Sequence, residues 1–139
     1  MLLHVKVVGA TNVPSMDLLS KSDPFVVIIP SFVNKKLQTS HKNDTDNPVF
    51  NEDFTFTIKN EKEDYLYFEL YDYDEVGQHD LISTIQIDFN DLFEGEVITK
   101  KLEMIPAKGI KQAPIITLQF HMAVRGRPKF VSYKIVQGN

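Results

Sequence analysis

Apolar and polar residues alternate along several short stretches of the chain, and this period of two is typical of β-strands that bury one face. The clearest example contains Leu66, Phe68 and Leu70. Clusters of proline, glycine and asparagine separate these stretches at intervals of about 8–15 residues. Eight strands are expected, at residues 3–7, 25–29, 35–42, 50–58, 65–71, 82–87, 97–104 and 116–122. The pattern predicts an all-β protein, an eight-stranded antiparallel β-sandwich without a long amphipathic helix.

Two segments do not follow this alternation. Residues 90–95 are expected to form one short helical turn, which Asn90 caps and Gly95 ends. Residues 125–139 carry four positive charges and no acidic side chain. We expect one sandwich domain at residues 1–124, followed by a basic tail at 125–139 that either adds an edge strand or is mobile.

Composition narrows the classes of function. A length of 139 residues suits one domain with a real core. The absence of cysteine excludes disulfides and thiolate metal sites, and a formal net charge of −4 argues against nucleic-acid binding. The apolar start is too short, and too broken by His4 and Lys6, for a signal peptide. These features lead us to expect a cytoplasmic protein.

Three aspartates follow the expected strand at residues 65–71. Asp72 and Asp74 are two residues apart, so they point to the same side of an extended chain, about 7 Å from each other. The chain then turns at Gly77 and returns a third carboxylate, Asp80. Like charges this close repel each other, which costs stability unless a cation lies between them.

Two further aspartates, Asp17 and Asp23, flank the first long loop. Loops of a sandwich cluster at its two ends, so all five carboxylates can meet. Calcium prefers six to eight oxygen ligands in flexible geometry, whereas zinc prefers His or Cys and magnesium takes fewer carboxylates. The alternative is that aspartate simply favours turns, which explains one or two of these residues.

An EF-hand is the other calcium-binding motif to consider. Asp72, Asp74 and Gly77 match part of the opening of its loop. The motif requires a bidentate glutamate at its twelfth position, where this chain has Ser83, and its flanks should be helices. We therefore reject it.

Taken together, the motifs resemble those of the C2 domain family. They are Leu3-x-Val5-x-Val7-x-x-Ala10, Asp17 with Ser22-Asp23-Pro24-Phe25, Asn47-Pro48-Val49-Phe50-Asn51-Glu52-x-Phe54, and Asp72-x-Asp74 with Asp80. The chain departs from the family pattern at Phe50, where tryptophan is usual, and at Ser83, where glycine is usual. The order of the motifs and strands resembles the circular permutation called type II.

The resemblance implies a calcium-dependent module that docks on anionic membranes. It carries calcium-ligand roles over to Asp17, Asp23, Asp72, Asp74 and Asp80, with backbone carbonyls from Met16 and Tyr73, and it implies two calcium ions. The expected partner is an anionic phospholipid membrane containing phosphatidylserine, with phosphoinositides as a further possibility, and the protein would be peripheral on it when calcium rises.

Lipid contacts outside the carboxylates are also expected. Met16, Leu18, Leu19 and Val76 lie at the expected loop tips, where apolar side chains can enter a membrane. The alternative is that the leucines pack back onto the sandwich. Lys35, Lys36 and Lys42 lie on the expected basic strand, where the family often binds phosphoinositide headgroups. Lysines also commonly protect edge strands from aggregation.

Two other functions compete with membrane docking. A calcium-independent module for protein–protein interaction would have the same fold, with the aspartates as inherited loop residues. An enzyme is not expected, since no motif pairs a nucleophile with a base and five acids suit a metal better than acid–base catalysis.

Overall fold

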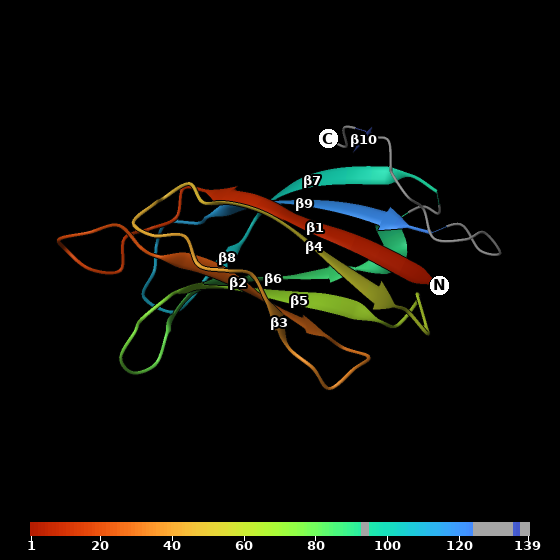
Figure 1. The fold of residues 1–139 in the computed structure, drawn as a ribbon, viewed down its shortest axis with the longest axis horizontal. Coiled ribbons are helices and arrows are strands. Elements are labelled where there is room, and N and C mark those ends of the chain that lie inside the picture. Colours follow the sequence, from red (N-terminus) through yellow and green to blue (C-terminus); the bar gives the residue numbers. More distant parts are fainter. Residues whose placement is uncertain (93–94, 124–134, 137–139) are drawn as a thin grey trace.

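Two facing β-sheets form the protein in a computed structural model that describes residues 1–92, 95–123 and 135–136 (Figure 1). The strands in these residues are β1 (Leu2–Thr11), β2 (Pro24–Pro30), β3 (Leu37–Gln38), β4 (Val49–Thr57), β5 (Tyr65–Asp72), β6 (Asp80–Asp88), β7 (Val97–Glu103), β8 (Ile105–Pro106), β9 (Ile115–Met122) and β10 (Ile135–Val136). One sheet has the order β10-β7-β9-β1-β4 and the other has the order β3-β2-β5-β6-β8. The predicted all-β sandwich is therefore confirmed.

The core lies between the two sheets and is built by the alternation seen in the sequence. Leu3, Val5 and Val7 of β1 are fully buried, and so are Leu66, Phe68 and Leu70 of β5 in the opposite sheet. Each apolar side chain of this size contributes about 1.5–3 kcal/mol when it is fully buried. The strands are paired antiparallel except β10, which runs parallel to β7.

The expected basic strand at residues 35–42 is much shorter in the structure. Only Leu37 and Gln38 pair with β2. At the next residue, the Thr39 side-chain hydroxyl accepts the hydrogen bond of the Val26 N–H, at 3.0 Å, in place of a backbone carbonyl. The Thr39 N–H still donates to the Val26 carbonyl at 2.9 Å, so the regular ladder ends where the hydroxyl takes the place of the Thr39 carbonyl in one of the two bonds.

Two smaller expectations were also wrong. The helical turn is a 3-10 turn at Phe89–Asp91, without a side-chain cap, rather than a turn at residues 90–95. Its first residue, Phe89, is buried in the core. The loop expected after Met104 contains β8, whose two residues pair with Ser83 and Thr84 and are too few to produce an alternating pattern.

The C-terminal tail expected at residues 125–139 lies mostly outside the described residues. Within it, Ile135 and Val136 pair with Val97 and Ile98 of β7. In the described part of the chain, no helix is long and apolar enough to cross a membrane.

Three loops gather at one end of the sandwich, at the left of Figure 1: residues 12–23, 39–48 and 73–79. Backbone hydrogen bonds hold them together. The Val13 N–H donates to the Asp46 carbonyl and the Thr45 N–H to the Ser22 carbonyl, each at 3.0 Å. The Tyr73 N–H donates to the Asp23 carbonyl at 2.9 Å, so the third loop is joined to the first. We call this end the carboxylate end, because it carries all five predicted aspartates.

Gly9 is the residue at which β1 allows the loop at residues 39–48 to approach. The register of β1 shifts between Val7 and Gly9, and the Ala10 N–H then donates to the Pro48 carbonyl at 3.0 Å. A Cβ atom on Gly9 would lie 2.5 Å from that same carbonyl oxygen, which is closer than van der Waals contact allows. Only glycine fits here without a shift of the backbone.

Replacing Gly9 with alanine should therefore destabilise the fold. We expect Gly9→Ala to lower the free energy of unfolding by about 1–3 kcal/mol, as overpacking commonly does. Urea denaturation followed by circular dichroism measures it. Thr11→Ala, at the exposed end of the same strand, is the control and should change stability by less than about 0.5 kcal/mol. Equal stability of the two variants would contradict this account of Gly9.

Candidate functional site

A hollow of about 590 Å³ opens between the first and third loops of the carboxylate end. All five predicted aspartates line it, namely Asp17, Asp23, Asp72, Asp74 and Asp80. Met16, Tyr73 and Val76 line it too, as do Ser20, Lys21, His41, Asn43 and Glu75. The fold therefore brings together carboxylates that lie on two loops far apart in the sequence.

Asp17 is held by its own loop. Its Oδ1 atom accepts hydrogen bonds from the backbone N–H groups of Leu19 and Ser20, at 3.0 and 2.9 Å. These bonds favour the ionised carboxylate and hold the pKa of Asp17 below its ordinary value. The first loop thus contributes a carboxylate that stays negative.

Asp23 and Asp72 connect the loops to each other. The Asp23 N–H donates to Asp72 Oδ1 at 2.8 Å, where the first residues of β2 pair with the end of β5. Asp23 Oδ1 in turn accepts a hydrogen bond from the Asp44 N–H, at 2.6 Å. Both carboxylates therefore have positions set by backbone groups rather than by flexible side chains.

The third loop is braced by aromatic rings. The Asp74 N–H donates to His79 Nδ1 at 2.9 Å, and Asp74 Oδ1 accepts from the Val76 N–H at 3.2 Å. His79 stacks on Tyr73 at 4.9 Å between ring centroids, and His41 stacks on Tyr73 at 3.9 Å. The sequence did not predict this stack, since His41 comes from a different loop and no spacing links it to the others.

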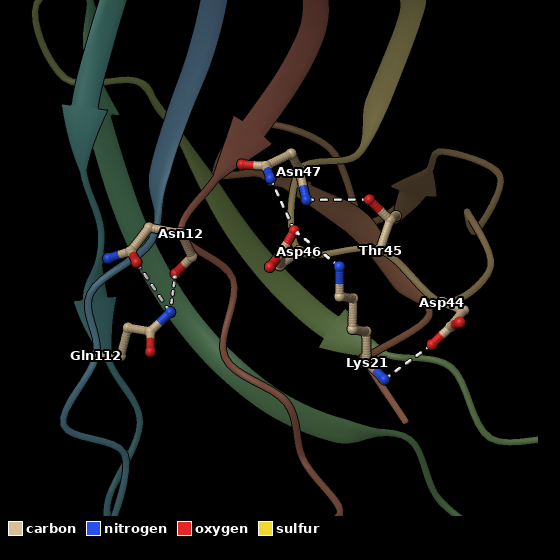
Figure 2. A network of polar contacts seen from close by, with 7 residues as sticks. All are labelled: Asn12, Lys21, Asp44, Thr45, Asp46, Asn47 and Gln112. Atoms are coloured by element: carbon tan, nitrogen blue, oxygen red, sulfur yellow. Dashed lines mark hydrogen bonds and ion pairs between the residues drawn. The ribbon is translucent and has the colours of Figure 1, made fainter. Parts of the chain in front are cut away.

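The middle loop, residues 39–48, supports the first loop from the side (Figure 2). Asp44 Oδ1 accepts a hydrogen bond from the Lys21 N–H at 2.8 Å. The Lys21 ammonium extends to Asp46, with 3.8 Å between Nζ and Oδ1. Lys21 is the one lysine or arginine that lines the hollow among the described residues, and Asp46 draws it to the side.

The carboxylates strain one another electrostatically. The pKa of Asp72 is raised, first because burial penalises its charged form and then because Asp23, Asp80 and Asp17 repel it. The hydrogen bond from the Asp23 N–H opposes this rise. A positive charge in the hollow would relieve this repulsion.

The donor set suits a hard cation. Carboxylates and backbone carbonyls are oxygen ligands of the kind that calcium prefers, and the chain has no cysteine. In the present side-chain positions, no three acidic, histidine or cysteine residues of the described segments are arranged to hold a metal. Instead, four of the aspartates each accept a hydrogen bond from a backbone N–H through one carboxylate oxygen. They are Asp17, Asp23, Asp72 and Asp74. These side chains would have to turn to share an ion.

The two loops that line the hollow carry exposed apolar side chains, which we call the apolar rim. Leu18 and Leu19 are 101% and 98% exposed and Val76 is 83% exposed, so none of the three packs back on the sandwich. Met16 differs from them, because it is partly buried and packs against the core. The structure therefore places three of the four expected tip residues in solvent.

The three expected lipid-binding lysines do not lie together. Lys42 is at the carboxylate end, where its N–H donates to the carbonyl of Pro24, the first residue of β2. Lys35 and Lys36 lie in the turn that follows Pro30, the last residue of β2. Because Leu37 pairs with Ile28, the backbone of Lys36 lies near Ile29, and about five residues of β2, roughly 16 Å, separate it from that of Lys42.

Comparison with known proteins identifies the kind of domain. The family model described as the C2 domain matches residues 1–104. Cytosolic phospholipase A2 delta of Mus musculus is 30% identical over 105 residues, which are 75% of this chain and 13% of that protein. Synaptotagmin-1 of Aplysia californica is 37% identical over 99 residues, 69% of this chain and 23% of that protein. The chain thus spans less than a quarter of either relative.

A solved structure agrees with these matches. A C2 domain of plant Extended Synaptotagmin 1 superimposes with a TM-score of 0.81 at 26% sequence identity. The match covers 86% of this chain and 92% of that domain.

The repulsion at Asp72 leads to a prediction for the metal-free protein. Asp72→Asn keeps an oxygen for the Asp23 N–H and removes the charge, so it should stabilise the fold in chelator at neutral pH. Because the folded pKa is raised, the gain should shrink as the pH falls through that pKa and vanish well below 3.8, where the unfolded state is protonated too. Solvent screening keeps the gain below about 1 kcal/mol.

Thermal unfolding in chelator across this pH range is the measurement. Glu103→Gln, an exposed residue of β7, is the control for an equal change of charge. A lower melting temperature for Asp72→Asn than for the unsubstituted chain at neutral pH would contradict the interpretation.

Proposed function

The chain belongs to the C2 domain family, and on that basis we propose that it is a calcium-dependent phospholipid-binding module that docks on anionic membranes. The observation that carries the proposal is the shared hollow, in which five aspartates lie on the same two loops as the exposed apolar rim. A cation held by the carboxylates would attract anionic headgroups, and the exposed apolar side chains would contact the acyl chains. On this proposal the protein is cytoplasmic and becomes peripheral on a membrane when calcium rises.

The metal-binding residues follow from the donor set. Asp17, Asp23, Asp72, Asp74 and Asp80 would hold two calcium ions, with the backbone carbonyls of Met16 and Tyr73. The bound ions would supply four positive charges, against a formal net charge of −4, and coordination positions for lipid phosphate or serine carboxylate oxygens. Without a cation, the same carboxylates repel an anionic surface.

The protein's own side chains add to the membrane contact. Leu18, Leu19 and Val76 are exposed, so their burial among acyl chains would be favourable, at about 1.5–3 kcal/mol for each fully buried side chain. Met16 would contribute less, because part of its side chain is already buried. Lys42 lies at the same end and would meet acidic headgroups such as phosphatidylserine, whereas Lys35 and Lys36, toward the other end of β2, are not part of this membrane contact.

The domain that does this is proposed to be residues 1–124, with residues 125–139 as a basic tail or an added edge strand. The family model covers residues 1–104 of it. We do not propose catalysis, since the relatives that are named as phospholipases are matched over only a small part of their length.

A calcium-independent protein-interaction module is the second candidate function. It is favoured by the hydrogen bonds that Asp17, Asp23 and Asp72 already make within the loops. These bonds hold the carboxylates in place without a cation, which a purely structural role requires. Cosedimentation with phosphatidylserine vesicles, in calcium and in chelator, separates the two functions. Pelleting only with calcium supports the first function, and pelleting in neither condition favours the second.

Removing two of the proposed ligands should abolish calcium binding. Asp72→Asn combined with Asp74→Asn takes two negative charges from the hollow while leaving the strand pairing of β5 intact. Isothermal titration should give no calcium heat for this variant. Glu63→Gln combined with Glu103→Gln removes the same charge from exposed positions away from the hollow and should titrate like the unsubstituted chain. An unchanged titration of the aspartate variant would rule out the site.

The apolar rim should matter for lipid and not for calcium in solution. We expect Leu18→Ser and Leu19→Ser each to weaken calcium-dependent vesicle binding by about tenfold, the equivalent of roughly 1.4 kcal/mol. Ile105→Ser is the matched control, because Ile105 is also exposed, at 66%, but lies on β8. Cosedimentation across lipid concentrations is the measurement. Equal vesicle binding by all three variants would exclude insertion of the leucines.

A further inference from the structure

A second hollow, of about 360 Å³, lies on the side of the sandwich between the edges of its two sheets. Its apolar lining comes from Phe32, Val33, Leu37 and Phe56, and its two charged residues are Lys35 and Lys59. None of these residues lines the carboxylate hollow. We call these six residues the lysine groove.

The groove is apolar at its base and basic in charge. Phe56 is buried, Phe32 lies across it edge-on with 6.2 Å between ring centroids, and Val33 is 43% exposed. An adjoining hollow of about 460 Å³ shares Phe32, Val33 and Lys35 and adds Lys36. No acidic side chain of the described residues lines either hollow. The lysine groove therefore favours an anionic ligand with an apolar part, although the formal net charge of the chain is negative.

The groove also runs beside two strand edges. β3 and β4 are the edge strands of their sheets on this side, and β4 is nine residues long. Toward the carboxylate end the gap between them is closed, because Ser40 donates hydrogen bonds to Glu52 through its N–H and its hydroxyl. Beyond that closure, at Thr55–Thr57, the outer edge of β4 has no partner strand among the described residues. An exposed edge of this kind is a template for one more strand.

We propose that the lysine groove binds an acidic, extended peptide segment of a partner protein. The peptide adds as a strand to the outer edge of β4, places one apolar side chain against Phe32 and Leu37, and sets acidic residues near Lys35 and Lys59. Backbone hydrogen bonds supply affinity and the hollow supplies specificity, as in other cases of strand addition. This interaction needs neither calcium nor lipid, so it does not depend on the proposed membrane function.

The shape of the groove favours a peptide over a membrane. Phe32, Leu37 and Phe56 are at least partly buried between the sheet edges, whereas Leu18 and Leu19 protrude into solvent. A bilayer surface can receive a protruding side chain but cannot fill a recess. A phosphorylated headgroup would use the lysines and leave the apolar base uncovered.

The test begins with a phage-displayed library of random peptides of about ten residues, which are longer than the accessible edge at Thr55–Thr57 and leave flanking residues to reach Lys35 and Lys59. The intact chain is the bait, and calcium is removed with chelator. We expect the selected sequences to carry one apolar residue flanked by Asp or Glu. A selected peptide is then synthesised with a fluorescent label, and its dissociation constant is measured by fluorescence anisotropy.

Two variants of the protein and one modified peptide each test a different part of the proposal. Lys35→Glu with Lys59→Glu should weaken peptide binding by about tenfold or more. Lys108→Glu with Lys111→Glu, an equal change of charge on the exposed loop after β8, should leave it unchanged. Val33→Gln should weaken binding by placing an uncharged polar side chain in the apolar hollow, and N-methylation of alternate peptide nitrogens should weaken it by blocking strand pairing.

Several results would overturn the proposal. One is a selection that enriches no acidic apolar sequence. Others are equal losses in the two lysine pairs, which would indicate general electrostatics, or full binding by the N-methylated peptide. If no such peptide is selected, while vesicles with phosphatidylinositol bisphosphate bind in chelator through Lys35 and Lys59, the groove recognises a lipid headgroup and the peptide proposal is wrong.

Discussion

Mutual repulsion among carboxylates governs the functional end of this protein. The fold brings Asp17 and Asp23 beside Asp72, Asp74 and Asp80, and burial makes the charge of Asp72 costly. Backbone N–H groups from the loops themselves stabilise several of these carboxylates. The loops can therefore stay folded while the carboxylates are charged. A cation that binds among them would relieve their mutual repulsion. The stability of the loops and their proposed response to calcium thus have the same physical origin.

The sandwich supports this end because its strands are paired where the loops begin. The pairing of Pro24 with Asp72 sets β2 against β5, and from there Asp23 and Asp72 reach the same hollow. The middle loop approaches closely because β1 has a glycine opposite Pro48. Precise backbone contacts in the sheets thereby position side chains that lie on otherwise irregular segments.

The two hollows divide the surface by chemistry. The carboxylate hollow is acidic with a protruding apolar rim, and the lysine groove is basic with a recessed apolar base. They share no lining residue, so a membrane at one and a peptide at the other would not compete directly. A module that holds a lipid surface and a partner at once would act as an adaptor.

The order of residues was enough to predict the sandwich and to nominate the candidate ligands. Alternation reports burial directly, so β1 and β5 were readable, and the motifs around Asp23 and Asp72 identified the family. No pattern revealed the two-residue strands β3 and β8, the stack of His41 on Tyr73, or the separation of Lys42 from Lys35 and Lys36. These features depend on which segments meet across the sheets, and a local pattern contains no such information. They became visible in the folded chain alone, because contacts between distant residues form when the whole chain packs.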